Sequence, residues 1–355
     1  MVQFLTPRLR ALSAATIGAA AMFAAPLALA DSISPVSFSA DLGVGESVTI
    51  TKTVVIEATG PTEALLDVMF LFDTTGSMGE EIASAKAKAA SILGSLAGFG
   101  DVATGTGWYN DPGTMGLMTN LTTNNAAAIA NINAVPFAPG SGGDADEQGV
   151  KGIVEATGAA WRAGSNRFVL AFGDAAFKGD NAVAIAALNG VDATFIGIKF
   201  LGGGSNFSDD ADPIAAATGG SVIDSTASGD DIADAIIAGI EAGFAKYGSV
   251  TVSDLGAGLP EIGVSAVCTG ADIGVCGGAF ATGAYDRSVD RTFTFDVTFT
   301  RLVAGDTTFS THAIVDKGIV ASERDTFGGT VPEPGSLALL AMGLIGLGAS
   351  RRRVH

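Results

Sequence analysis

Histidine is nearly absent from this chain of 355 residues, which contains only His312 and His355. Ser-His-Asp catalysis, Cys-His catalysis and histidine-rich zinc sites all need well-placed imidazoles, so these classes are almost excluded. Neither an HExxH helix nor a GxxxxGK[ST] phosphate-binding loop occurs in the sequence. We therefore expect a protein that is not an enzyme, with a metal-dependent hydrolase as the competing hypothesis.

Positive charge is also scarce. The chain has 19 Lys and Arg residues against 37 Asp and Glu residues, which gives a formal net charge of −18. An acidic surface repels a phosphate backbone, so the composition argues against nucleic-acid binding. Hydrophobic residues make up 48% of the chain, which argues against disorder.

The N-terminus has the pattern of a secretory signal. Arg8 and Arg10 supply a positive region, an apolar run follows from residue 11 to 29, and Ala28-Leu29-Ala30 matches an A-x-A cleavage site. We predict a signal peptide over 1–30 and a mature chain that begins at Asp31. An uncleaved membrane anchor is the alternative.

The C-terminus carries a second signal in three ordered parts. Pro332-Glu333-Pro334 precedes an apolar run over 336–349, and Arg351-Arg352-Arg353 follows it. The run is short for a full membrane span, which needs roughly 20 residues, and the arginines would stay cytoplasmic. This tail, over 331–355, closely resembles the PEP-CTERM sorting signal. The resemblance implies an exosortase partner, a transient membrane anchor at 336–349 and export to the cell envelope, outer surface or extracellular matrix. An ordinary C-terminal anchor is the alternative.

The two cysteines, Cys268 and Cys276, agree with export, because paired cysteines are usual in oxidising compartments. A disulfide between them would close a short loop and stabilise the fold by roughly 2–3 kcal/mol. Neither has a nearby histidine or a CxxC partner, so a metal or catalytic role is disfavoured.

The middle of the chain alternates strand and helix patterns, which predicts an α/β fold with a Rossmann-like, doubly wound, mostly parallel sheet. The apolar runs at 65–72, 167–172 and 191–200 suit buried parallel strands. Helical patterns occupy 79–96, 124–133, 147–161, 181–188, 209–217 and a segment from an expected N-cap at Asp230 to Tyr247.

The flanking segments instead alternate polar and apolar residues, as in 47–54 and 292–300, which is typical of half-buried antiparallel strands. A two-stranded hairpin is marginal alone, so the N-terminal strands need partners. We infer that 31–62 and 249–330 form one smaller antiparallel β-sandwich, into which the domain at 63–247 is inserted. Two independent β-modules are the runner-up.

A candidate metal site follows the first core strand. Asp73, Thr75 and Ser77 form a D-x-T-x-S motif just before the 79–96 helix. Alternate side chains of such a loop point the same way, so one carboxylate and two hydroxyls can converge on a hard cation. The neutral hydroxyls leave the ion net positive, with a position open to a partner's carboxylate. Helix capping alone would explain the hydroxyls equally well.

Two later segments strengthen the metal hypothesis. The 142–147 segment, which ends in Glu147, opens a predicted helix, and Asp174 follows the 167–172 strand. Both lie where ligands of a doubly wound sheet bind, beyond the carboxyl ends of its strands. Together with the first loop they resemble the metal-ion-dependent adhesion site (MIDAS) of von Willebrand factor A (vWA) domains, in particular the I-like branch of integrin β subunits.

The resemblance implies that Glu147 and Asp174 complete the ligand set and that Glu80 and Glu81 bind a second metal. A solvated first helical turn, favoured by the helix dipole, also explains these two glutamates. The chain departs from that branch at Thr75, where the branch has Ser, and at Asp146, where it has Pro. Thr122, a possible ligand in other branches, is interpreted as a helix N-cap.

These patterns predict an exported envelope or matrix protein that uses a divalent metal to engage an acidic group of a protein or polysaccharide. Mg²⁺ is the default for a compact all-oxygen site, and Mn²⁺ or Ca²⁺ are possible. A structural protein whose metal only stabilises the fold is the third reading.

Overall fold

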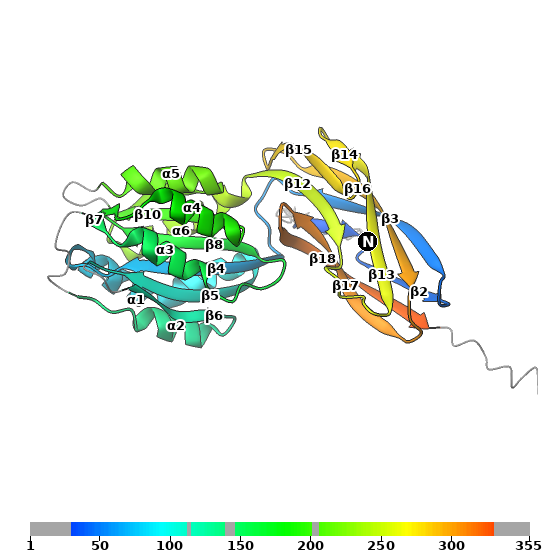
Figure 1. Cartoon of the computed structure of the whole chain (residues 1–355), viewed down its shortest axis with the longest axis horizontal. Coiled ribbons are helices and arrows are strands. Elements are labelled where there is room, and N and C mark those ends of the chain that lie inside the picture. Colours follow the sequence, from blue (N-terminus) through cyan, green and yellow to red (C-terminus); the bar gives the residue numbers. More distant parts are fainter. Residues whose placement is uncertain (1–29, 112–114, 139–145, 201–205, 330–355) are drawn as a thin grey trace, which may run out of the picture.

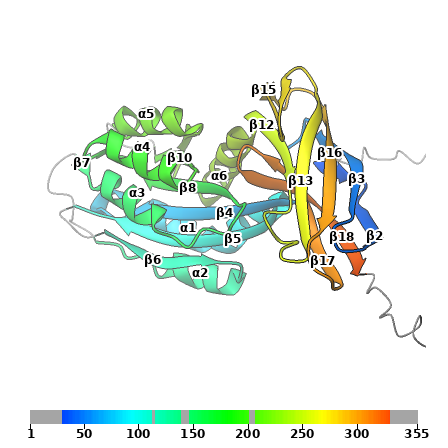
Figure 2. The same cartoon turned by 45° about the vertical axis from the view of Figure 1, so that its right-hand side comes forward.

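The computed structural model describes residues 30–111, 115–138, 146–200 and 206–329. Two lobes lie side by side, an α/β domain and a sandwich of two β-sheets (Figures 1 and 2). The chain runs through three strands of the sandwich, builds the whole α/β domain, and then returns to complete the sandwich.

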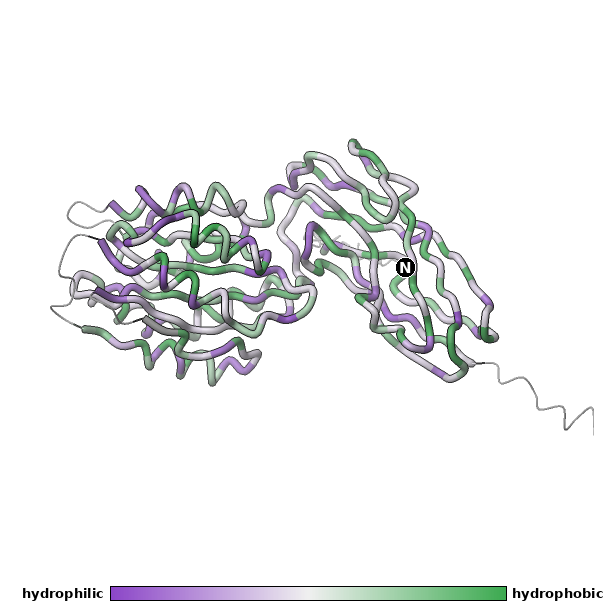
Figure 3. Tube along the Cα trace, viewed as in Figure 1, coloured by the Kyte–Doolittle hydropathy of each residue, from purple (hydrophilic) through white to green (hydrophobic). Residues whose placement is uncertain are grey.

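The α/β domain is built on a six-stranded sheet in the order β11-β10-β8-β4-β5-β6. All neighbours are parallel except β5 and β6, which are antiparallel. The strands are β4 (Ala64–Asp73), β5 (Gly100–Tyr109), β6 (Met115–Thr122), β8 (Asn166–Gly173), β10 (Ala193–Phe200) and β11 (Ser221–Ser225). Because β4 is apolar along almost its whole length, it is buried on both faces and lies near the middle of the sheet. Figure 3 shows the hydrophobic colour running along these inner strands.

Helices cover both faces of this sheet. The segments are η1 (Gly76–Met78), α1 (Gly79–Leu96), η2 (Ala97–Phe99), α2 (Asn125–Asn133), α3 (Gly149–Thr157), α4 (Asn181–Gly190), α5 (Ser208–Thr218) and α6 (Gly229–Phe244). α1, α2 and α6 share one hydrophobic core with the sheet, and α3, α4 and α5 share another. The doubly wound, mostly parallel sheet expected from the sequence is confirmed.

Two sheets face each other in the sandwich, in the orders β1-β3-β16-β13 and β14-β15-β12-β17-β18-β2. The first comprises β1 (Ser32–Ser34), β3 (Ser47–Ile56), β16 (Arg291–Arg301) and β13 (Ile262–Ala271). The second comprises β14 (Val275–Gly277), β15 (Phe280–Asp286), β12 (Lys246–Ser253), β17 (Thr307–Val315), β18 (Gly318–Gly329) and β2 (Ser37–Leu42).

The N-terminal strands of the sandwich pair with strands from the far end of the chain. β3 runs antiparallel to β16 over ten residue pairs, from Ser47 opposite Thr300 to Ile56 opposite Arg291. β2 pairs in parallel with β18, so the prediction of an antiparallel sandwich was wrong at this edge. A disulfide between Cys268 and Cys276 joins β13 of one sheet to β14 of the other. The α/β domain is therefore an insertion between strands that share one core.

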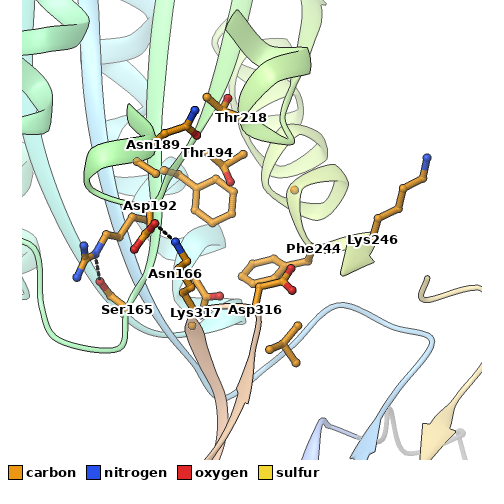
Figure 4. Close-up of a pocket in the computed structure, with 16 residues that line it drawn as sticks. Ser165, Asn166, Asn189, Asp192, Thr194, Thr218, Phe244, Lys246, Asp316 and Lys317 are labelled. Atoms are coloured by element: carbon orange, nitrogen blue, oxygen red, sulfur yellow. Dashed lines mark hydrogen bonds and ion pairs between the residues drawn. The ribbon is translucent and has the colours of Figure 1, made fainter. Parts of the chain in front are cut away.

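The two lobes meet at the amino ends of β8 and β10. The backbone N–H of Ile319 donates to the carbonyl of Gly164 (2.8 Å), and Asn166 Nδ2 donates to the carbonyl of Ile319 (2.8 Å). Lys317 and Asp192 form an ion pair across the same seam. Asn166, Asp192 and Lys317 also line a cavity of about 260 Å³, to which both lobes contribute (Figure 4).

Several predicted element boundaries were wrong. The helix expected over 147–161 spans only α3, because Asp146 and Glu147 form a short strand, β7, that pairs with β9 (Ala176–Phe177). The residue that caps α6 is Ser228, not Asp230, and α6 ends at Phe244. β5, β6 and β11 were not predicted from the sequence patterns. Thr122 ends β6, and the N-cap of α2 is Asn124.

Within the described ranges, no helix combines the length and apolar character that a membrane span requires. The predicted signal peptide, the sorting motif Pro332-Glu333-Pro334 and the apolar run at 336–349 lie outside the described residues.

Candidate metal centre

The loop after β4 is organised by a buried carboxyl group. Asp73 is fully buried, and its Oδ1 accepts hydrogen bonds from the backbone N–H (2.9 Å) and the hydroxyl (2.7 Å) of Thr75. Its other oxygen, Oδ2, is buried with no hydrogen-bond partner among the described residues. A buried oxygen without a donor is costly, and a cation bound beside it would remove that cost.

Neighbouring strands fix the backbone of this loop. The N–H and hydroxyl of Thr74 both donate to the carbonyl of Tyr109 (2.9 and 3.0 Å), at the end of β5. Asn110 Nδ2 donates to Thr74 Oγ1 (3.0 Å), and the Tyr109 hydroxyl donates to the carbonyl of Phe172 on β8 (3.1 Å). The carboxyl ends of β4, β5 and β8 are therefore tied together.

Ser77 and Asp174 lie far apart in sequence but touch in the fold. Ser77 Oγ donates to Asp174 Oδ1 (3.1 Å), which joins the first turn after β4 to the loop after β8. Ser77 is exposed and Asp174 half-buried, so this side of the site faces solvent. The loop beyond Asp174 is anchored where Ala176 N donates to Asn206 Oδ1 (2.9 Å) and Phe177 N to Asp210 Oδ2 (2.8 Å).

Glu147 reaches the same edge of the sheet through the short β7–β9 pairing. Glu147 pairs with Phe177, and its carbonyl accepts from the N–H of Lys178 (2.6 Å). The side chain is 5% exposed, and within the described part of the chain its Oε2 is buried and meets no hydrogen-bond donor. Glu147 therefore resembles Asp73, because each is a buried carboxyl group with one oxygen that has no hydrogen-bond partner among the described residues.

Burial, and to a smaller extent the neighbouring negative charges, raises the pKa values of these carboxyl groups. Burial raises the pKa of Asp73 to about 7, against the hydrogen bonds from Thr75 that lower it, and the charge of Asp174 adds to the rise. Burial also raises the pKa of Glu147 to about 8, and the charges of Asp73 and Asp111 add to this. Such shifts mean that the ionised carboxylates repel one another and are poorly solvated, a state that a divalent cation would relieve.

The residues fit a metal through their mixed donor set. Across the described ranges, no three His, Cys, Asp or Glu side chains come close enough to enclose an ion by themselves. A metal here would also need hydroxyl ligands, which Thr75 and Ser77 can supply beside the carboxyl groups. The carboxyl oxygens without a hydrogen-bond partner belong to Asp73 and Glu147. Carboxylate and hydroxyl oxygens suit Mg²⁺, Mn²⁺ or Ca²⁺.

The two glutamates at the start of α1 differ in their surroundings. Glu80 is exposed. Glu81 is half-buried, burial and the charge of Asp174 raise its pKa, and its Oε2 has no hydrogen-bond partner in the described structure. Glu81 therefore borders the site, whereas Glu80 resembles a solvated residue of the first helical turn.

The polar groups around Glu147 were not predicted from the sequence. Lys178 Nζ lies 2.5 Å from Asp111 Oδ2, and Gln148 Nε2 donates to Asp111 Oδ1 (3.2 Å). The positive charge of Lys178 lowers the pKa of Glu147 and partly offsets the acidic neighbours. The turn signal Asn110-Asp111-Pro112-Gly113, directly after Trp108-Tyr109, marks the end of a strand and was available in the sequence.

Thr122 lies away from this centre. It pairs with Thr104, which pairs with Val68, five residues before Asp73 on β4. At about 3.3 Å per residue, that places Thr122 roughly 16 Å down the sheet. Thr122 Oγ1 accepts the N–H of Asn124 instead.

Comparison with known families decides the identity of this domain. Residues 67–206 match the family model of the von Willebrand factor A domain. The α/β lobe is a vWA domain. Residues 330–353 match the PEP-CTERM protein-sorting motif, which implies exosortase-dependent sorting and export to the cell envelope. No curated protein matches the chain.

Solved structures that match the chain include three with low sequence identity. A von Willebrand factor type A protein from Catenulispora acidiphila is 13% identical, with a TM-score of 0.43, and the match covers 87% of this chain and 74% of that one. The protein BatB from Bacteroides thetaiotaomicron is 14% identical, with a TM-score of 0.38 and coverage of 49% and 98%. An aerotolerance-related membrane protein from Bacteroides fragilis NCTC 9343 is 14% identical, with a TM-score of 0.37, and the match covers 49% of this chain and 98% of that one.

Within the vWA domain, the site lies at the carboxyl ends of the parallel strands, where doubly wound sheets bind ligands. The interdomain cavity of Figure 4 lies at the opposite, amino end of β8 and β10 and contains none of the residues singled out from the sequence. It is the seam between the lobes rather than part of the candidate metal centre.

Proposed function

We propose that this exported vWA protein binds a divalent metal, most simply Mg²⁺, and uses it to engage an acidic group of a protein or polysaccharide in the envelope or matrix. The observation that carries the proposal is the pair of buried carboxylate oxygens without a donor, Asp73 Oδ2 and Glu147 Oε2, among the described residues. They come from segments distant in sequence, and their charges act on each other.

The residues of the candidate site would have different roles in metal binding. Asp73 and Glu147 supply buried negative charge, while Thr75 holds Asp73 in place through two hydrogen bonds. Ser77 and Asp174 lie on the solvent side, where a ligand arrives. The bound ion supplies a positive centre with an open position for a carboxylate of the partner.

An apolar contact beside the site would add to partner binding. Phe137 is 41% exposed, and its ring packs so closely over Gly79, at the start of α1, that a Cβ there would lie 2.8 Å from Cζ. The next residue, Ala138, donates its N–H to the carbonyl of Thr74. Exposed aromatic residues next to a charged centre are typical of binding surfaces.

A binding role is favoured over the competing hydrolase. His312, the histidine within the described residues, lies on β17 of the sandwich, where Nδ1 meets Ser322 Oγ (2.7 Å). It therefore cannot serve as a base at the carboxyl end of β4. The remaining alternative, a metal that only stabilises the fold, predicts no metal-dependent partner.

The test is retention of envelope and matrix fractions by the immobilised protein in Mg²⁺ or in EDTA. We expect partners that are retained in Mg²⁺ and released by EDTA, and that Asp73→Ala fails to retain. Asp234→Ala, which removes an exposed carboxylate from α6, is the matched control and should behave as wild type. Equal retention with and without Mg²⁺ would contradict the proposal.

A further inference from the structure

A lysine occupies a core position of the sandwich. Along β3, the inward positions alternate through Ile50, Lys52, Val54 and Ile56, so Lys52 stands where the pattern calls for an apolar residue. Its side chain is 0% exposed. A lysine is almost never fully buried without a compensating partner.

Two acidic residues face it from the other sheet. Glu323 and Asp325 take successive inward positions on β18, between Ala321 and Phe327. The ammonium nitrogen of Lys52 contacts Glu323 Oε1, and it lies 3.5 Å from Asp325 Oδ1. The side chains of both ion pairs are 0% exposed, so all three groups meet in the buried core of the sandwich.

The surroundings treat the two carboxyl groups differently. Asp325 Oδ2 accepts a hydrogen bond from the buried hydroxyl of Thr311 on β17. Apart from the contact of Lys52 with Oε1, neither oxygen of Glu323 has a hydrogen-bond partner in the described structure. The ring of Phe299 lies 5.2 Å from Lys52 Nζ and helps to keep water away.

Such a pair is poorly stable as ions. Removing each ion from water costs several kcal/mol, and only well-formed hydrogen bonds offset this desolvation cost. Burial lowers the pKa of Lys52, against the charge of Asp325 that raises it, so the neutral amine is accessible. A neutral amine in contact with a carboxyl group that lacks other partners is a nucleophile placed at an acyl carbon.

We propose that Lys52 and Glu323 condense into an intramolecular amide bond that cross-links β3 to β18. The lone pair of Lys52 Nζ attacks Cδ of the protonated Glu323 carboxyl group, and the C–N bond forms as the C–OH bond breaks. One proton from nitrogen and the hydroxyl group leave together as one water molecule. No oxidant or co-substrate is required.

Asp325 is the positioning and proton-relay residue of this reaction. Its Oδ1 is 3.5 Å from Lys52 Nζ and can take the proton that the amine loses, while Thr311 holds the other oxygen in place. After condensation, Oδ1 remains as an acceptor for the new amide N–H. The product replaces two buried charges with a neutral group.

The cross-link would have a consequence for the whole chain. β3 precedes the vWA domain and β18 follows it, so the bond closes a covalent ring around the complete insertion. Unfolding or proteolysis of the vWA domain would then leave the two halves of the sandwich joined. This feature is independent of the metal centre and of the proposed function.

Tryptic peptide mapping of the exported protein tests the proposal. In a linked chain, trypsin cannot cut after Lys52, so 31–86 stays intact and carries the peptide 318–324, with the mass of one water missing. Trypsin cuts between Arg324 and Asp325, so the map also identifies the acyl partner. Recovery of free 31–52, 53–86 and 318–324 would overturn the proposal, and a link to the peptide that begins at Asp325 would overturn the assignment to Glu323.

Variants separate chemistry from packing. Lys52→Met should abolish the link. Lys317→Arg, in the exposed turn that precedes β18, is the control and should keep it. Asp325→Asn should slow formation of the link roughly 100-fold or more, the usual scale of a lost proton-transfer group. Linking of Asp325→Asn at the wild-type rate would refute the relay role. The wild-type map decides the main claim even if a variant fails to fold.

Discussion

The proposed metal site depends on single carboxyl groups that are buried and have one oxygen without a hydrogen-bond partner among the described residues. Asp73 is buried at the end of an apolar strand, and Glu147 is also buried and close enough for the charge of Asp73 to raise its pKa. An ordinary capping loop needs hydroxyls near the helix start but no buried carboxylate with a free oxygen. The distinction between a helix cap and a metal site is therefore made by the burial of Asp73, which the sequence pattern alone does not give.

At this scale the metal-free protein should lose stability as the pH rises. An unfolded Asp or Glu titrates near pH 4, whereas the folded pKa values are about 7 for Asp73 and about 8 for Glu147. Between these values the folded state holds more protons than the unfolded state. The stability is full below about pH 4 and declines up to about pH 8, with a slope of up to about 1.4 kcal/mol per pH unit for the buried Asp73.

Urea unfolding in EDTA at a series of pH values measures this slope, and Asp73→Asn isolates the part that belongs to Asp73. The asparagine keeps an oxygen for the hydrogen bonds from Thr75 but cannot ionise. We expect the difference in stability between the variant and wild type to grow as the pH rises. Parallel profiles for the two proteins would refute the assignment of the raised pKa to Asp73.

The elements with strong periodicity were predictable, and those that depend on partners were not. The 79–96 helix was predicted to the residue, because its apolar positions recur on one face. β5 reads Gly-Asp-Val-Ala-Thr-Gly-Thr-Gly-Trp-Tyr, which carries little β-propensity, and it forms because β4 offers a full ladder of partners. The same holds for β7, a two-residue strand defined by β9.

The candidate site residues could likewise be identified from the sequence, but the sequence did not show that they lie close together in the fold. Asp73, Thr75 and Ser77 stand together in sequence, whereas Glu147 needs the β7–β9 pairing and Asp174 needs β8 beside β4. The supports Asn110 and Asp111 follow β5, a strand that was not predicted. Pairing between strands that are distant in sequence therefore places Glu147 and Asp174, and this pairing could not be predicted from the sequence motifs.

The element that positions Glu147 should be sensitive to one methyl group. At Gly149, the first residue of α3, an added Cβ would overlap the ring of Phe177 on β9. Gly149→Ala should destabilise the protein by about 1–3 kcal/mol through overpacking, and it should weaken metal binding because Glu147 is displaced. Urea unfolding and a metal titration measure the two effects.

Gly94→Ala is the matched control, because a Cβ there meets nothing within 4 Å. It lies inside α1, so we expect it to stabilise the protein by roughly 0.5–1 kcal/mol and to leave metal binding unchanged. If Gly149→Ala binds metal as tightly as Gly94→Ala, the β7–β9 contact does not position the ligand.

At the scale of the whole molecule, the vWA domain has its own core on both faces of its sheet, and the sandwich is completed only by the N-terminal strands. We therefore expect a fragment of residues 63–247 to fold alone. A fragment of residues 249–330 should not fold, because it lacks β3, which pairs with β16 along its length. Circular dichroism melts test both fragments, and a cooperative melt of 249–330 would favour an independent β-module.

Asp31 shows how the two ends of the chain depend on each other. This residue, the expected start of the mature chain, is buried and pairs with Arg287, whose Nη2 lies 2.6 Å from Asp31 Oδ2. The same guanidinium donates to the carbonyls of Glu57 and Thr59 (2.9 Å each). The N-terminal segment therefore belongs to the folded body.

The central claim, that Asp73 and its neighbours hold a divalent cation, is tested most directly by thermal melts with Mg²⁺, Mn²⁺, Ca²⁺ or EDTA. Binding to the folded state stabilises it by RT ln(1 + [L]/Kd), about 2.7 kcal/mol at a metal concentration of 100 Kd, so the wild-type melting temperature should rise with metal. Asp73→Ala should abolish that rise, Ser77→Ala and Asp174→Ala should reduce it, and the exposed control Asp234→Ala should preserve it. In EDTA, Asp73→Ala should melt slightly above wild type, because a repelling carboxylate is gone. Identical metal-induced shifts in wild type and Asp73→Ala would contradict the account, because the ion would then bind elsewhere.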